Sequence, residues 1–141
     1  MSRIRSRRPE IVFSTVVLSV LAWLGGCRTD PNSARGVAEK FVDAHYVRID
    51  LPEAKGIVSG LALHKLEDEQ HLTAGQIIDE TTRMPTVRYR LLEEKSDADT
   101  ASFVFEGTIQ VEDAGQFTRR WIVTTRHSDN AWRVSNFEEF D

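Results

Sequence analysis

The side chains that could carry chemistry in this sequence are one cysteine, four histidines and the charged residues around them. The single cysteine, Cys27, cannot form an internal disulfide or a cysteine-rich zinc site within this chain. It stands directly after an apolar run, residues 11–24, and two glycines. That position makes its thiol the most informative side chain of the sequence.

His45 is the histidine whose surroundings favour acid/base chemistry. It lies in the middle of an apolar stripe at helical spacing and is expected to face the interior, where a buried histidine can act as a general acid or base. A lone histidine on an apolar face is more often a core residue, and we predict no catalytic residue here. His64, His71 and His127 are too scattered for a metal site, and no nucleotide or phosphate motif occurs, so no cofactor or metal is predicted.

The first 26 residues have the features of an export signal. Four arginines precede the uncharged run of 14 residues at 11–24, which is short for a membrane span of about 20. The segment Leu24-Gly25-Gly26-Cys27 resembles the lipobox of bacterial lipoproteins. In that family, small residues admit the signal peptidase, and the cysteine thiol receives a diacylglyceryl group before cleavage. The resemblance implies lipidation of Cys27, with acyl chains such as palmitate in the membrane.

The resulting organisation has three parts: a signal peptide over residues 1–26, the lipidated Cys27 with a short tether over residues 27–33, and a single α+β domain over residues 34–141. In Gram-negative lipoproteins an aspartate after the cysteine retains the protein on the inner membrane. Arg28 occupies that position, which favours the periplasmic face of the outer membrane. The alternative is an uncleaved helix that anchors the domain as an interaction module.

The charge of the mature chain excludes one class of partner. Removing the four arginines and one glutamate of residues 1–26 from the 18 basic and 22 acidic residues leaves 14 and 21, a net charge of −7. Sequence-independent nucleic-acid binding needs a basic surface, so we expect no nucleic-acid partner.

Apolar spacing predicts two or three helices in the first half of the domain. Asp30 before Pro31 is typical of a helix start, and an amphipathic stripe then runs over residues 34–49. A second stripe covers residues 54–69, and the capping-box spacing of Thr73 and Gln76 indicates a short third helix through residue 79 or 80.

After Pro85 the pattern changes to alternation. Segments 86–94, 102–112, 117–127 and 131–140 are rich in β-branched and aromatic residues and are separated by short polar turns. Such short connections require antiparallel neighbours, which predicts a four-stranded meander with the helices packed on one face. Gly107, in the middle of the second segment, is expected to allow a bulge or bend.

Helices followed by a curved meander that ends in Trp132-Arg133-Val134-Ser135-Asn136-Phe137 resemble the nuclear transport factor two-like superfamily. This cone-shaped, cystatin-like α+β fold is shared by ketosteroid isomerase and scytalone dehydratase. The resemblance implies a sheet wrapped around helices, and it covers enzymes, ligand binders and interaction modules alike. Its members usually carry a further strand near the helices, which the sequence does not show.

Two groups of residues are candidates for a site. The pocket candidates are His45 on the helical stripe, Tyr46, which follows it in sequence and is expected to turn outward, and Trp121 and Asn136, which share the inward parity of the last two strands. The interface candidates, which share the outward parity, are Arg88, Arg90, Arg120, Arg126, Arg133, Ile122 and Phe137. Arginine and aromatic residues are enriched where proteins meet, and relatives of this fold often dimerise through the outer sheet face.

These observations favour a lipid-anchored protein of the cell envelope whose domain binds a partner protein, a second copy or a small apolar ligand without catalysis. The alternative is a small enzyme of the isomerase or dehydratase kind that uses His45 as its acid/base group. That alternative requires an enclosed cavity on which His45 and a further polar group converge.

Overall fold

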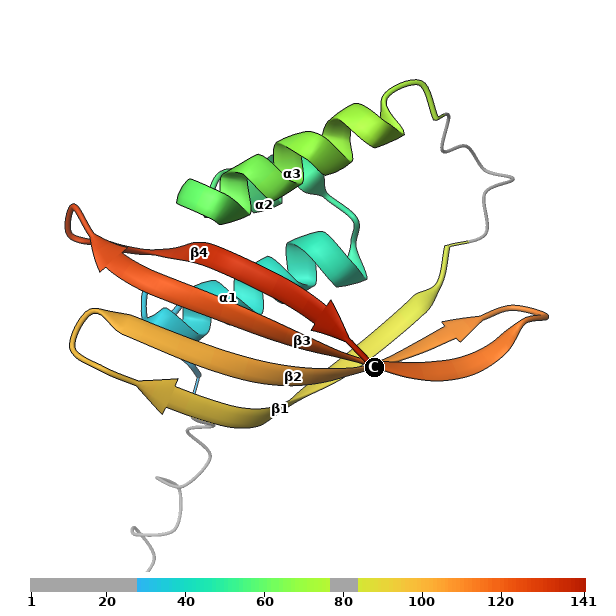
Figure 1. Ribbon diagram of the computed structural model, residues 1–141. Coiled ribbons are helices and arrows are strands. Elements are labelled where there is room, and N and C mark those ends of the chain that lie inside the picture. Colours follow the sequence, from blue (N-terminus) through green and yellow to red (C-terminus); the bar gives the residue numbers. More distant parts are fainter. Residues whose placement is uncertain (1–27, 77–83) are drawn as a thin grey trace, which may run out of the picture.

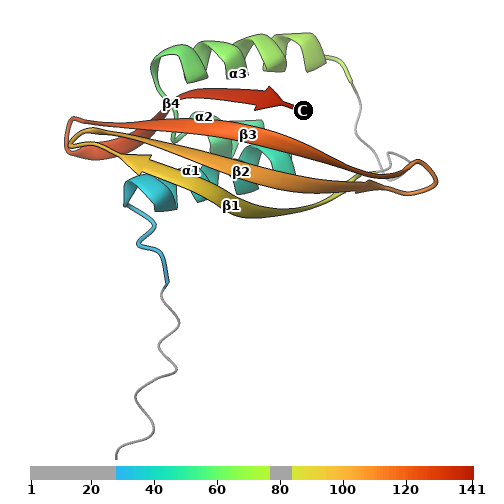
Figure 2. The same cartoon turned by 60° about the horizontal axis from the view of Figure 1, so that its bottom comes forward.

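The computed structural model of the chain describes residues 28–76 and 84–141; the predicted signal peptide, Cys27 and the predicted third helix from residue 77 on lie outside these residues. Four antiparallel strands form one sheet in the order β1-β2-β3-β4, and the helices cover one of its faces (Figures 1 and 2). The predicted α+β meander is therefore confirmed. No helix of the described part is long and apolar enough to cross a membrane.

The strands follow the predicted segments closely. They are β1 (Thr86–Ser96), β2 (Thr100–Val111), β3 (Gly115–Ser128) and β4 (Ala131–Phe140). Positive φ angles at Asp113 and Gly115, and at Asp129 and Asn130, mark the turns that close the β2–β3 and β3–β4 hairpins. Polar residues and glycine tolerate this left-handed backbone, which is why the sequence located both turns.

The helices are more divided than the apolar stripes predicted. They are α1 (Ala34–Val42), the π-helical turn η1 (Asp43–Val47), α2 (Leu51–Lys55) and α3 (Gly60–Thr73). The first predicted helix is thus α1 continued by η1, and the second is split by residues 56–59. Thr73 ends α3 and does not open a new helix.

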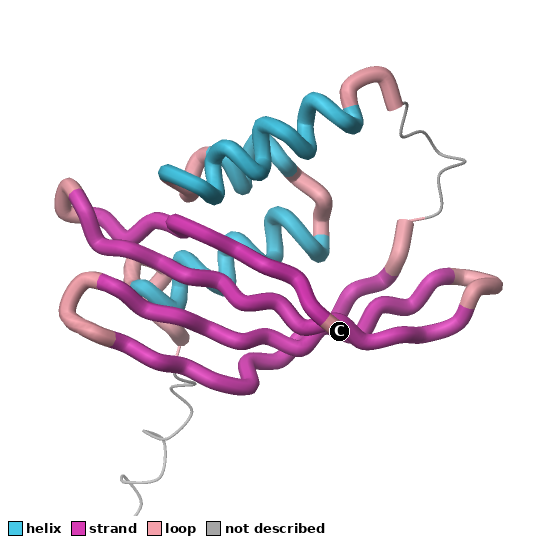
Figure 3. The backbone as a smooth tube through the Cα atoms, in the orientation of Figure 1, coloured by secondary structure: helices cyan, strands magenta, loops and turns pink. Residues whose placement is uncertain are grey.

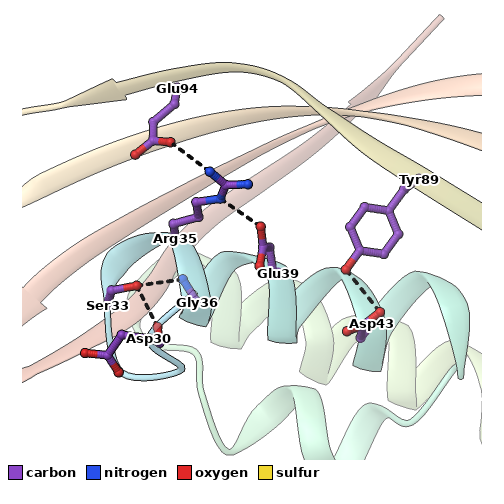
Figure 4. A network of polar contacts seen from close by, with 8 residues as sticks. All are labelled: Asp30, Ser33, Arg35, Gly36, Glu39, Asp43, Tyr89 and Glu94. Carbon is purple, nitrogen blue, oxygen red and sulfur yellow. Dashed lines mark hydrogen bonds and ion pairs between the residues drawn. The ribbon is translucent and has the colours of Figure 1, made fainter. Parts of the chain in front are cut away.

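The start of α1 differs from the prediction. The N-cap is Ser33, whose hydroxyl accepts a hydrogen bond from the Gly36 amide at 3.0 Å. Asp30 serves the turn before the helix, where its carboxylate accepts from the Asn32 amide at 2.9 Å. Arg35 pairs with Glu39 within α1, and its guanidinium also faces Glu94 of β1, which links the helix to the sheet (Figure 4). The Asp-Pro signal therefore marks the turn that leads into the helix.

A short backbone pairing covers part of the free edge of β4. The Val134 amide donates to the Ile57 carbonyl at 2.9 Å, and the Ser59 amide donates to the Val134 carbonyl at 2.8 Å. Val58 and Val134 form an isolated parallel bridge. A single paired residue leaves no alternating pattern, so the sequence did not reveal this pairing.

The core lies between α1 and the half of the sheet nearer the β1–β2 and β3–β4 turns, which is called the wide end below. Phe41, Phe103, Phe105 and Val123 are fully buried, and Leu66 of α3 closes the cluster above β4. At about 25 cal/mol per Å² of apolar area, this burial is the main force that holds the helices on the sheet. The inner face of the sheet is therefore the one that carries Phe103 and Phe105 of β2 and Val123 of β3.

Gly107 has a different role from the predicted bulge. The register runs without interruption through it, with Tyr89 on one side and Arg119 on the other. A Cβ atom at this position would overlap the six-membered ring of Trp121. The glycine therefore makes room for the indole, which lies across β2.

The bulges lie elsewhere, at Leu92 in β1 and at Ser135 in β4. Val134 pairs with Thr125, but Asn136 pairs with Thr124, so Ser135 is the extra residue. Every later side chain of β4 therefore changes face. Phe137 turns inward, with 6% of its surface exposed, and its predicted place on the outer face is wrong. Asn136 turns to the face of Thr124, so its predicted inward direction is wrong as well.

Candidate functional site

The end of η1, the second half of α3 and the end of β4 meet at the open end of the cone. Two surface grooves lie there and share His45, Tyr46 and Glu69. The polar groove, of about 410 Å³, is further lined by Lys65, Phe137, Glu138 and Glu139. The apolar groove, of about 340 Å³, is further lined by Ile49, Leu51, Leu72 and Thr73. Together they are called the mouth groove below.

His45 is held at the bottom of the mouth groove by rings and one carboxylate. Its ring stacks on Phe41 at a centroid distance of 5.2 Å and lies 5.0 Å from the ring of Phe137. Its Nε2 is 2.6 Å from a carboxylate oxygen of Glu69. The Nδ1 atom is buried and has no hydrogen-bond partner among the described residues. The imidazole thus joins η1 to α3, and its second nitrogen is shielded from solvent.

Tyr46 and Trp121 fill the interior next to His45. Their rings stack at a centroid distance of 4.1 Å and an interplanar angle of 9°. Burial, followed by the carboxylates of Glu139 and Glu69, raises the pKa of the Tyr46 phenol, which keeps it neutral. The Trp121 indole donates to Glu139 at 3.2 Å, and Glu139 also faces the Arg119 guanidinium at 3.6 Å. Side chains therefore occupy the space that would be the cavity of the cone.

The single lysine in the lining is engaged with the sheet edge. Lys65 Nζ donates to the Asn136 side-chain oxygen at 2.9 Å and to the Phe137 carbonyl at 2.7 Å. Its ammonium also lies 5.4 Å from the centre of the Phe137 ring. Glu138 receives a hydrogen bond at 3.3 Å from the Asn136 amide. The mouth groove therefore presents three carboxylates beside one lysine whose donors serve the backbone and an amide.

Three of the four predicted pocket residues come together. His45 and Tyr46 line the mouth groove, and Trp121 supports it from below. Asn136 lies on the other face of β4 and contributes through Lys65, which reaches it around the strand edge. Sequence reasoning missed Glu69 and Lys65. They are four residues apart in α3, a spacing that places both on one side of the helix, but nothing in the sequence showed that this side faces His45.

The outer sheet face carries the five predicted arginines, and all five are exposed. Two of them share one carboxylate within the sheet: Glu106 lies 2.8 Å from Arg90 and 3.8 Å from Arg120, on the strands at either side. Arg133 donates to the Gly56 carbonyl at 3.1 Å. Arg88 and Arg126 make no ion pair within the described residues. Ile122 is half-buried among these side chains, and the face as a whole is a mixed surface.

Metal-ligating side chains do not gather in the described ranges, where no group of three or more His, Cys, Asp or Glu residues is close enough to hold an ion. The carboxylates of the mouth groove are instead bonded to His45, to the indole of Trp121 and to the amide of Asn136.

Comparisons with known proteins give structural relatives only. No family model matches the chain, and no curated protein matches it. Among solved structures, a calcium/calmodulin-dependent protein kinase type II association domain from Thiobacillus denitrificans matches with a TM-score of 0.55 and 10% identity, over 72% of this chain and 90% of that one. The chain has the nuclear transport factor two-like cone fold. At this identity the likeness concerns the fold alone.

A second solved structure is more distant. The intermembrane space region of the chloroplast protein ARC6 matches with a TM-score of 0.42 and 13% identity, over 80% of this chain and 98% of that one. A TM-score at this level carries no argument about topology or site.

Proposed function

We propose that this chain is a lipid-anchored protein of the bacterial cell envelope whose cone domain is a non-catalytic binding domain. The anchor rests on the lipobox-like segment that ends at Cys27 and on the basic, apolar leader before it. Arg28, which follows the cysteine, supports the periplasmic face of the outer membrane. A six-residue tether, residues 28–33, spans at most about 20 Å and holds the domain close to the bilayer.

One observation carries the binding function: neighbouring side chains pack closely around His45. Trp121 lies over Gly107, Tyr46 stacks on Trp121, and His45 is enclosed by rings with its accessible nitrogen engaged by Glu69. The enzyme alternative needs a cavity where a substrate meets His45 and a second polar group. The two grooves that His45 lines are open to solvent, and such surface grooves are suited to binding a partner protein.

The relative from Thiobacillus denitrificans supports the same proposal, because it is described as an association domain. By analogy, the cone of this chain serves protein interaction. The tether places the interaction surface well for that role. The chain enters the domain at the end of the sheet that carries the β1–β2 and β3–β4 turns, away from the second half of α3 and the end of β4, which line the mouth groove (Figures 1 and 2).

Metabolic labelling tests the anchor. Cells that express the full chain are grown with radiolabelled palmitate, and the chain is recovered from the membrane fraction. Wild type and the leader variant Ser19→Ala are expected to carry label and to lose residues 1–26, whereas Cys27→Ala remains unlabelled and unprocessed. Unlabelled wild-type chain, or an intact mass that retains residues 1–26 without acyl groups, contradicts the anchor.

A further inference from the structure

We propose that the mouth groove binds an amphipathic, basic peptide segment of a partner protein. The inference rests on the proposed binding function and names its site and partner chemistry. Aliphatic side chains of the segment occupy the apolar groove between η1 and α3, and a lysine or arginine meets the carboxylates beside β4.

The apolar groove exposes apolar side chains to water, which is energetically unfavourable. Leu72 is 81% exposed and Ile49 is 41% exposed, and they face the same depression together with Leu51. Scattered apolar residues are normal on a protein surface, but grouped ones that line a depression mark contact sites. Both residues lie beside the His45–Glu69 pair, so the exposed apolar surface adjoins the polar groove.

The polar groove has an excess of negative charge. Glu69, Glu138 and Glu139 line it, and the ammonium of Lys65 is directed to the Asn136 oxygen and the Phe137 carbonyl. Glu139 has Arg119 beside it, and Glu69 has His45. Glu138 has only the Asn136 amide within the described residues. A cationic side chain entering here gains Glu138, which has no cationic partner among the described residues, with two further carboxylates beside it.

The two grooves fit one occupant because they share three lining residues. An occupant that crosses the His45–Glu69 pair places aliphatic groups on one side of it and cationic groups on the other. A peptide segment meets this requirement with neighbouring side chains. A membrane surface does not, since the anionic headgroups of bacterial lipids would face carboxylates. The second half of α3 and the end of β4, which line the mouth groove, lie away from the start of α1, where the tether ends, and this also favours a soluble partner over the bilayer (Figures 1 and 2).

A pair of peptides tests the charge requirement. The full chain, extracted in detergent, is titrated with two fluorescent octapeptides that contain four leucines and either four lysines or four glutamates. The lysine peptide should bind wild type at least tenfold more tightly than the glutamate peptide does. The variant E69Q/E138Q should bind the lysine peptide about tenfold more weakly than wild type, because two exposed ion pairs are lost. The matched variant E93Q/E112Q changes the net charge equally, outside the mouth groove, and should bind like wild type. Equal affinities of both peptides, or equal loss in both variants, overturn the proposal.

Cross-linking in cells tests the location with the anchored chain. A photoreactive phenylalanine analogue replaces Leu72 in the mouth groove or, as the matched control, Leu61 on the same helix, which is 54% exposed and does not line the groove. The expected result is a protein adduct at Leu72, absent at Leu61, whose cross-linked segment contains lysine or arginine beside aliphatic residues and whose yield falls in E69Q/E138Q. Lipid adducts, acidic segments or equal adducts at both positions contradict it. If Cys27 carries labelled palmitate but one of these contradicting results is found, the lipid anchor is supported and the mouth groove is rejected as the binding site.

Discussion

The inner face of the sheet has two ends that share one sequence pattern and differ in burial. At the wide end, Phe103, Phe105 and Val123 are fully buried beneath α1. Toward the β2–β3 hairpin, the alternation continues with Ile109 paired to Phe117, but Ile109 is half-buried and Phe117 is 45% exposed. Figure 3 shows the hairpin extending past the helices. The alternation within a strand therefore determines which side chains lie on the inner face, and the extent of the helices determines how many of them are buried.

The boundary between the two ends carries the candidate site. Trp121 is the last fully covered aromatic residue of β3, and Arg119, the next inward residue toward the hairpin, is already partly exposed. Glu139 bonds to both of them. Polar side chains enter the inner face where the helical cover ends, because water reaches them there and no desolvation cost is incurred. The mouth groove occupies this transition.

The largest expected effect comes from truncating one aromatic residue at each end. Phe105→Ala removes a fully buried ring and should lower the free energy of unfolding by about 3–5 kcal/mol. Phe117→Ala should lower it by less than about 1 kcal/mol, because its ring is already 45% exposed. Urea unfolding followed by circular dichroism measures both. Similar losses in the two variants would mean that the hairpin end is as well packed as the core.

The second effect concerns the boundary itself. Gly107→Ala places a methyl group against the indole of Trp121 and should cost about 1–3 kcal/mol, since a rigid ring cannot yield as a flexible chain does. In the background Trp121→Leu the same substitution should cost clearly less. This double-mutant cycle isolates the contact. Additive losses would show that Gly107 is required for a reason other than the indole.

The fold could be predicted from the sequence where local signals decide it. Turn residues such as Asp113 and Gly115 indicated where the hairpins close. Because the connections between the strands are short, neighbouring strands had to be antiparallel. The direction of the β4 side chains after Ser135 could not be predicted. A bulge depends on how two strands pair, and no residue pattern within one strand indicates it. Phe137 and Asn136 were consequently assigned to the wrong faces.

The candidate site could be predicted only in part, for a similar reason. His45 was identified because a polar residue on an apolar stripe is a local anomaly. Its partner Glu69 is 24 positions away on a helix with a mostly polar surface, where one glutamate resembles its neighbours. The exposed pair Ile49 and Leu72 likewise becomes a groove only when η1 and α3 are packed together.

A smaller effect is expected from the tyrosines at alkaline pH. Burial raises the pKa of Tyr46 and also that of Tyr89, whose hydroxyl donates to Asp43 at 3.1 Å (Figure 4). A raised phenol pKa contributes stability that is present below the ordinary value of 10.0 and is lost as the pH rises above it. Tyr46→Phe should therefore unfold at a higher pH than wild type, although their stabilities at neutral pH differ little.

Tyrosinate absorbance checks this, since the chain has only these two tyrosines. In the wild type, absorbance should rise together with the loss of circular dichroism, because the phenols ionise when the sheet and helices separate. Free ionisation of both tyrosines near pH 10, with the fold intact, would show that the mouth groove admits water down to Trp121.

The smallest effect belongs to the outer face. Glu106→Gln removes the carboxylate shared by Arg90 and Arg120, yet these arginines are 72% and 50% exposed and interact through water and salt. The loss should stay below about 1 kcal/mol and should decrease further at high ionic strength. A loss above 2 kcal/mol that salt does not reduce would mean that the outer face is shielded from solvent, as it would be in an interface between two copies. The same variant therefore distinguishes charged side chains that are exposed to solvent from ones that are buried. A buried outer face would favour that face, and not the mouth groove, as the binding surface of the cone.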